Sequence, residues 1–172
     1  VNVGGNANAS GHFWGTFPIH KKVLKLSTSL SSNAYRNVNF VDDLENVTIT
    51  SAHTIGPSLE FEKKKMNASI GASVTYNTNS STFNTGASDP FFTQRYNGSL
   101  ELQLPKDLII KLDANYNINS QRVEGHNIEY VLVNASIAKA FFEKKNFILS
   151  VNATDILNQN ISAQRSVYDN VI

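Results

Sequence analysis

Side chains in many stretches of this chain alternate, with a period of two, between apolar or small residues and short polar ones. Residues 66–78 show the pattern most clearly, because Met66, Ile70 and Val74 fall on one parity. The other parity of this stretch carries Asn67, Ser69, Gly71, Ser73, Thr75 and Asn77. Successive side chains of a β-strand point to opposite faces. The alternation therefore predicts strands with one face suited to hydrocarbon and the other suited to water.

The same alternation recurs along the chain and predicts eight strands. They are expected at roughly residues 1–14, 23–36, 47–62, 66–78, 93–104, 108–121, 128–142 and 146–157. No stretch repeats its apolar residues with a period of 3.6, so helix is expected to be scarce. Each expected strand is longer than the common β-strand, which has about 5–6 residues. They also exceed the roughly 9–11 residues with which a tilted strand crosses a bilayer. Alternation and length together are typical of a transmembrane β-barrel.

The connections between the expected strands alternate between short and long. The short ones are 18–22, 63–65, 105–107 and 143–145, and the long ones are 37–46, 79–92 and 122–127. Outer-membrane barrels have short periplasmic turns and longer extracellular loops. The pattern therefore predicts periplasmic short turns, which would put both ends of the chain on the extracellular side. A complete bacterial barrel normally keeps both ends in the periplasm, so we expect residues 1–172 to be one partial barrel domain within a larger barrel.

Composition narrows the class of protein further. Only 17% of the 172 residues are charged and the net charge is +1, which gives no reason to expect a nucleic-acid partner. The polar residues are mainly Asn, Ser and Thr, whereas soluble domains usually cover their surface with Lys and Glu. A polar surface made of these residues fits a water-filled interior or channel better than the outer surface of a soluble domain. Cysteine is absent, which excludes disulfides and thiolate zinc sites. No run of about 20 apolar residues predicts a transmembrane helix.

Aromatic residues near the ends of the expected strands predict girdles at the membrane interfaces. These residues are Phe13, Trp14, Phe17, Phe61, Phe91, Phe92, Phe141, Phe142 and Phe147. The alternative interpretation is that they are hydrophobic plugs at the ends of a soluble β-sandwich.

Residues that could support catalysis or metal binding are scattered. Asp42, Asp43 and Glu45 share one long connection, but their spacing does not match an EF-hand, and we expect a solvated acidic loop. The four histidines lie on different expected elements, at positions His12, His20, His53 and His126. No nucleophile–base pair is evident. The sequence therefore predicts no enzyme, no catalytic residue, no metal and no cofactor, and it names no ligand-binding residue.

Three segments resemble the C-terminal barrel portion of TonB-dependent-receptor-like outer-membrane proteins. They are residues 14–22 (WGTFPIHKK), 55–59 (IGPSL) and 152–160 (NATDILNQN), and the similarity runs through most of the chain. The resemblance implies a barrel of about 22 strands with a plugged lumen. It also implies uptake of bulky solutes, with energy from an inner-membrane complex. The chain departs from the family pattern because it has no plug domain, no energy-coupling motif and no final strand that ends in an aromatic residue.

The sequence thus predicts an all-β, antiparallel up-and-down meander of about eight long strands, which forms part of a transmembrane β-barrel. The expected function is a non-catalytic part of a receptor or transporter for bulky solutes in the outer membrane of a Gram-negative bacterium. Expected partners are outer-membrane lipid, the rest of the parent barrel and its plug, and an extracellular solute, with no nucleic acid. One alternative is a secreted β-sandwich that binds carbohydrate or acts as an adhesin. Another is a small, complete eight-stranded barrel with a structural role.

Overall fold

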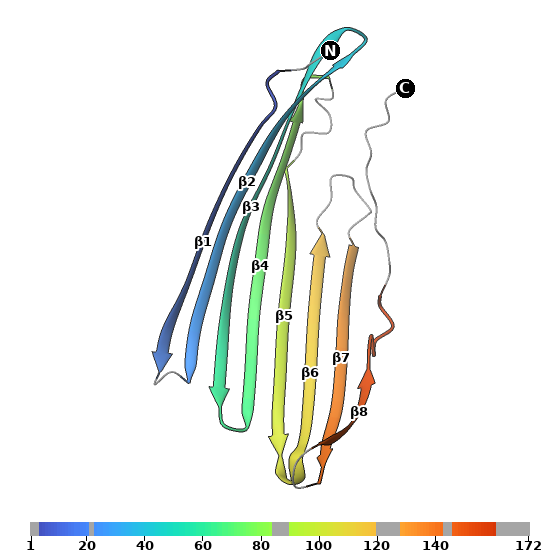
Figure 1. Ribbon diagram of the computed structural model, residues 1–172. Coiled ribbons are helices and arrows are strands. Elements are labelled where there is room, and N and C mark those ends of the chain that lie inside the picture. The colour runs from blue at the N-terminus through green and yellow to red at the C-terminus, as the bar shows by residue number, and fades with distance from the viewer. Residues whose placement is uncertain (1–3, 21–22, 84–89, 120–127, 143–145, 161–172) are drawn as a thin grey trace.

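The computed structural model describes residues 4–20, 23–83, 90–119, 128–142 and 146–160. These residues form one antiparallel sheet whose eight strands follow chain order, with β1 and β8 at opposite edges (Figure 1). The strands are β1 (Ala7–His20), β2 (Leu24–Val41), β3 (Leu44–Lys63), β4 (Met66–Ser81), β5 (Phe91–Leu104), β6 (Leu108–Asn119), β7 (Ile128–Phe141) and β8 (Phe147–Ala153). A 3₁₀ turn, η2 (Pro105–Asp107), joins β5 to β6. The predicted antiparallel meander of eight strands is confirmed.

Strand pairing places most apolar side chains of the central strands on one side of the sheet and most short polar side chains on the other. Directly opposite residues of an antiparallel pair point to the same face. One row across six strands contains Leu26, Leu59, Ile70, Gly98, Ala114 and Val133. The neighbouring row contains Ser27, Ser58, Gly71, Asn97, Asn115 and Leu132. We call the face of the first row the apolar face and that of the second row the polar face.

The described residues form a single layer with almost no interior. Only Val38 and Ser27 are buried, with exposed fractions of 5% and 8%. Ile70, in the middle of the apolar face, is 64% exposed. A β-sandwich would bury this face between two sheets, and the described residues form only one sheet. The sandwich alternative is therefore wrong for this fold.

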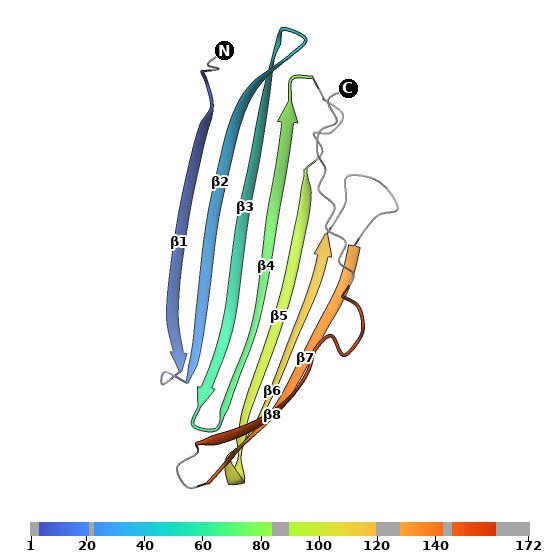
Figure 2. The ribbon, with the colours of Figure 1, turned by 45° about the vertical axis from the view of Figure 1, so that its right-hand side comes forward.

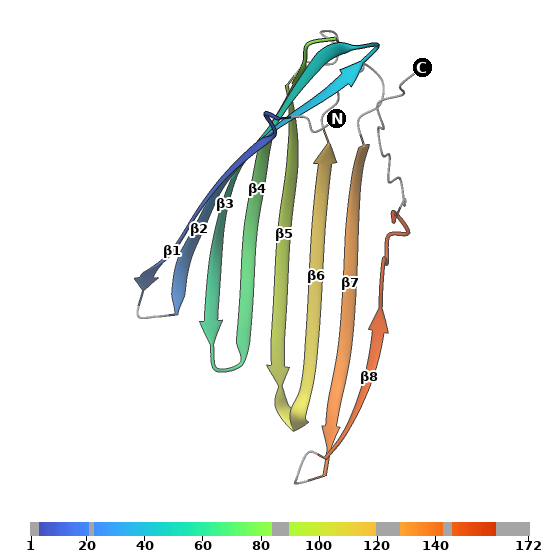
Figure 3. The same cartoon turned by 45° about the horizontal axis from the view of Figure 1, so that its top comes forward.

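The sheet is curved and twisted rather than flat, as Figures 2 and 3 show from two further directions. Twist of this kind follows from the right-handed preference of each strand. In the described part of the sheet, β1 pairs only with β2 and β8 only with β7, so the arc stays open. The closed eight-stranded barrel is not the arrangement that the chain adopts here. None of the described residues forms a helix that is long and apolar enough to cross a membrane.

The first strand differs from its predicted position. It covers Ala7–His20 instead of 1–14, so Pro18 belongs to the strand and not to a connection. The register shifts between Pro18 and His20. Proline has no N–H group and is accepted on an edge strand or at a bulge, and β1 is such an edge. Phe13 and Trp14 consequently lie in the middle of β1, which corrects the prediction that they mark a strand end.

The connection predicted as long at 37–46 is a two-residue turn. β2 continues to Val41, β3 begins at Leu44, and only Asp42 and Asp43 lie between them. Both aspartates have positive φ, of 50° and 62°, as in a type I′ hairpin turn. Short polar side chains tolerate this left-handed conformation. The aspartates predicted to lie in a solvated loop therefore form a tight turn between two strands. The strict alternation of short and long connections is wrong at this point.

The adjoining ends of β1 and β2, β3 and β4, β5 and β6, and β7 and β8 lie together at one end of the sheet, which we call the short-turn end (Figure 1). The β2–β3 hairpin projects at the other end, because β3 first pairs with β4 at Thr48 and Ser81. The side chain of Asn46 braces the base of the hairpin. Its Oδ1 accepts hydrogen bonds of 2.9 Å from the hydroxyls of Ser81 and Thr82. The hairpin is therefore a continuous extension of the sheet.

Replacing Asp43 by glycine is expected to stabilise the protein by up to about 1 kcal/mol, because glycine adopts positive φ without the steric cost that an L-residue carries there. Replacing Asp42 by valine is expected to destabilise it by about 1–2 kcal/mol, since a β-branched residue resists the left-handed conformation. Urea unfolding of the lipid-reconstituted protein measures both changes. Equal effects of the two substitutions would contradict a turn with two positive φ angles.

Candidate functional site

The centre of the polar face is built from unusually short side chains. Across β2, β3 and β4, nine neighbouring positions of this face carry only serine, threonine or glycine. They are Ser27, Ser29, Ser31, Thr54, Gly56, Ser58, Gly71, Ser73 and Thr75. Short side chains leave the space in front of the sheet free. An added Cβ at Gly56 would lie 2.7 Å from the Ser29 Oγ, so this part of the surface is also closely packed.

Many hydroxyl groups of this face satisfy one another across neighbouring strands. Hydroxyl pairs join Thr54 to Thr75 and Ser69 to Ser99, each at 2.8 Å. The Ser29 hydroxyl donates to the Gly56 carbonyl at 3.4 Å. Cross-strand pairs of this kind stabilise a sheet. They make a hydrophilic wall whose hydroxyl groups bond to one another and to the backbone.

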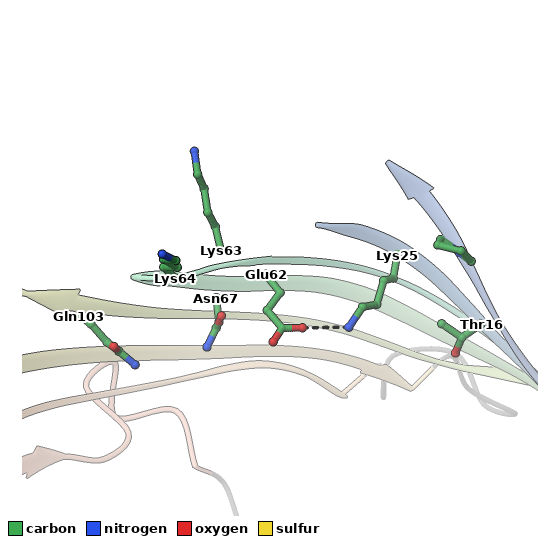
Figure 4. Close-up of a pocket in the computed structure, with 8 residues that line it drawn as sticks. Thr16, Lys25, Glu62, Lys63, Lys64, Asn67 and Gln103 are labelled. Carbon is green, nitrogen blue, oxygen red and sulfur yellow. Dashed lines mark hydrogen bonds and ion pairs between the residues drawn. The ribbon is translucent and has the colours of Figure 1, made fainter. Parts of the chain in front are cut away.

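Charged residues gather on the polar face near the short-turn end, in a depression of about 830 Å³. Figure 4 shows Thr16, Lys25, Glu62, Asn67 and Gln103 on one side of the sheet, with Lys63 pointing to the opposite side. The Lys25 Nζ donates to the Glu62 Oε2 at 2.9 Å, between adjacent strands. Both side chains remain open to solvent, where an ion pair contributes little to stability. The pair keeps the depression polar.

A second depression of about 410 Å³ adjoins the first on the same face. The Lys111 Nζ lies 2.8 Å from the Glu101 Oε2 there. Two further carboxylates, Glu60 and Asp113, line it on either side of the Ser69–Ser99 pair. The charged residues that line the two depressions are thus four carboxylates and four lysines, and two of these lysines, Lys25 and Lys111, are ion-paired. The sequence reading did not single out this group. The sequence feature that identifies this group is that its charged residues fall on the polar face of each strand, each a few positions from a short connection.

One row of the polar face combines short side chains with larger groups. Trp14 lies opposite Ser29, and Ser73 lies opposite Arg95. The Arg95 Nε donates to the Asn117 Oδ1 at 3.0 Å, which fixes the guanidinium against the wall. Trp14 therefore belongs to the polar face, although it was predicted to be part of a girdle with Phe13 and Phe17. An indole and a guanidinium are groups that stack on, or hydrogen-bond to, organic solutes.

The other aromatic residues of the predicted girdles lie at both ends of the sheet. Phe61, Phe141 and Phe147 lie toward the short-turn end, where the last two rings pack with centroids 5.7 Å apart. Phe92 lies toward the opposite end and packs on Tyr76 at 5.2 Å. A tyrosine pair that the sequence reading did not single out, Tyr96 and Tyr116, stacks at 6.1 Å on the apolar face.

The residues considered for catalysis or metal binding remain apart. His12 lies on the polar face, whereas His53 lies on the apolar face with its Nδ1 2.8 Å from the Ser32 hydroxyl. His20 ends β1, and His126 lies outside the described residues. Within the described ranges, no group of three or more His, Cys, Asp or Glu side chains is arranged to hold a metal ion. The arrangement of the polar face is that of a hydrophilic wall.

Two faces of opposite character, long tilted strands and a single layer are the geometry of a barrel wall between lipid and water. The model of one family, the outer membrane protein beta-barrel family, matches residues 20–172. No curated protein and no solved structure gives a match to the chain.

Proposed function

The chain belongs to the outer membrane protein beta-barrel family, and from this premise we propose that its sheet is one arc of a larger barrel that takes up bulky solutes. The chain is therefore an outer-membrane protein of a Gram-negative bacterium. In that setting the apolar face contacts lipid and the polar face lines the lumen.

The open edges support the proposal of a larger barrel. A strand edge in hydrocarbon leaves N–H and C=O groups unpaired, and each unsatisfied group costs several kcal/mol. Among the described strands, β1 and β8 each have one edge without a partner strand. We propose that further strands of the parent barrel pair with both edges and close the wall. The short turns are then periplasmic, and the β2–β3 hairpin is extracellular.

The short side chains at the centre of the polar face are the observation that carries the transport proposal. A barrel wall lined with Ser, Thr and Gly leaves a wide lumen, which a large solute or a plug domain needs. Trp14 and Arg95 lie in the same row as Ser29, Gly56 and Ser73, and they offer contacts to a passing solute. The charged depressions at the periplasmic end provide a polar surface for a plug. Substrate uptake driven by an inner-membrane complex is part of the same proposal.

Replacing Ser73 by tryptophan is expected to reduce uptake severalfold, because a bulky ring would then project into the lumen. The measurement is the accumulation of fluorescent oligosaccharides and peptides of graded mass in cells that produce the full-length protein. The matched control is Ile70→Trp, which places the same ring on the apolar face of the same strand and is expected to leave uptake unchanged.

Three results would count against the proposal. Uptake of every probe could be independent of the protein, which would favour a structural barrel. Both tryptophan variants could lower uptake equally, at equal protein levels, which would place neither residue in the lumen. Finally, Ile70→Trp alone could reduce uptake, which would reverse the assignment of the two faces.

A further inference from the structure

The apolar face carries a groove that a flat lipid-facing surface would not have. Its volume is about 580 Å³, and no charged residue lines it. We propose that this groove is a binding site for one acyl chain of an outer-membrane lipid. The proposal rests on the lipid-facing orientation of the apolar face and does not depend on the transport function.

The groove arises from the distribution of small and large side chains. Gly98 and Ala114 lie directly opposite each other on β5 and β6 and form its floor. On one side, Ile70 lies opposite Gly98 and stands out from the sheet. Two positions along the same strands, the rings of Tyr96 and Tyr116 stack at an interplanar angle of 25° and form a second wall, roughly at a right angle to the first. A strip of backbone and methyl groups between taller side chains is a channel suited to a hydrocarbon chain.

The tyrosine wall marks the boundary between the groove and polar surroundings. The Tyr96 hydroxyl donates to the Gln94 Oε1 at 2.8 Å, and the Tyr116 hydroxyl donates to the Glu129 Oε2 at 3.0 Å. Tyrosines at a membrane interface place the ring in the apolar region and the hydroxyl at the level of the headgroups. Gln94 and Glu129 lie in one cross-strand row with Val74 and Ile118, so polar groups interrupt the apolar face next to the tyrosine pair. One end of the groove therefore offers polar groups beside an apolar floor, as a lipid with a polar headgroup and an acyl chain requires.

The occupant follows from where the groove lies. It is continuous with the lipid-facing face, so in the membrane the surrounding medium is acyl chains. The floor is backbone and methyl groups, which offer an acyl chain contact area without any polar group to satisfy. An acyl chain bound there fills the space between the side chains that border the groove. It therefore has more contact with the protein than the neighbouring lipids have, which is why we expect it to stay bound.

Filling the groove tests the proposal. A Cβ at Gly98 would meet its nearest atom, the Ser69 carbonyl oxygen, at 3.8 Å, so Gly98→Leu is compatible with the backbone. The control is Ala135→Leu, which enlarges a small residue of the same face opposite Leu112 and outside the groove. The full-length protein is extracted from outer membranes in mild detergent, and native mass spectrometry counts the lipids that remain bound. We expect wild type and Ala135→Leu to retain one lipid that Gly98→Leu loses.

A second variant guards against misfolding of Gly98→Leu. Tyr116→Ala removes part of the wall and leaves the floor intact, and it is expected to weaken lipid retention several-fold with unchanged circular dichroism. Equal lipid retention in all four proteins would overturn the proposal. Loss of a dimer in Gly98→Leu, with no change in bound lipid, would overturn it in favour of a second copy of the chain. Because the readout is bound lipid, the result is independent of solute uptake.

Discussion

Replacing Leu112 by arginine is expected to lower the free energy of unfolding of the membrane-inserted protein by about 2–4 kcal/mol. Leu112 lies on the apolar face near the middle of β6, between Leu100 and Ala135 in its cross-strand row. The guanidinium would have to enter hydrocarbon, where hydration of the charge is lost. Urea unfolding of the full-length protein in lipid vesicles measures the change.

The matched control for this substitution is Asn115→Arg on the polar face of the same strand. Asn115 lies opposite Asn97, where an added arginine side chain extends into water. The change is expected to stay within about 0.5 kcal/mol, as for an ordinary surface substitution. Similar small effects at both positions would mean that both faces contact water. A large effect at Asn115 alone would exchange the two faces.

Transfer of the protein from detergent to plain buffer is expected to convert it from single, compact particles into large aggregates. Large apolar side chains such as Leu26, Ile70 and Ile137 are exposed on the apolar face of the described sheet. Contiguous exposed apolar area of this kind drives association in water. Light scattering coupled to size-exclusion chromatography follows the change. A protein that stays monomeric in buffer at every detergent concentration would contradict the lipid-facing assignment.

A triple variant sharpens this test, because it should act with opposite signs in the two media. Threonine at positions Leu26, Ile70 and Leu112 keeps the preference for strand and makes the apolar face more polar. The variant is expected to aggregate less in buffer than wild type and to be less stable in lipid. Threonine at Ser58, Asn97 and Asn115 on the polar face serves as the control, with little change in either medium.

The faces of the sheet could be predicted from the sequence because they depend on local order alone. Period-two alternation places Met66, Ile70 and Val74 together whatever their partners are. The register then aligned these residues with Leu102, Gly98 and Gln94 of β5, and two of the three partners are apolar or small. A shift by one residue would bring apolar side chains to the polar face, so burial against lipid selects the register.

Connections were predicted less well, because polar composition is shared by loops and tight turns. Asp42 and Asp43 were read as part of a long acidic loop, and they are a two-residue turn with positive φ. The flanking residues Val38 and Val47 pair across the hairpin and extend both strands. Their alternation is weak in sequence. Pro18 likewise predicts the start of a connection, whereas it lies within β1, because an edge strand accepts proline.

The ion pairs and the groove could not be predicted from the sequence, because each brings together residues of different strands. Lys25 and Glu62 are 37 residues apart and form an ion pair only because β2 and β3 pair in one register. The same holds for Glu101 and Lys111 on β5 and β6. The groove on the apolar face depends on Gly98 and Ala114 meeting across two strands. No local pattern marks either residue as part of a surface feature.

The sequence by itself determined the number of strands in the described sheet and their two faces, because period-two alternation is local. The tertiary structure decided the register and the open arc. With them it decided the two charged depressions, the Ser, Thr and Gly surface at the centre of the polar face, and the groove that Ile70 and the tyrosine pair border. These features bring together residues from different strands, and only backbone pairing across the sheet sets which residues meet.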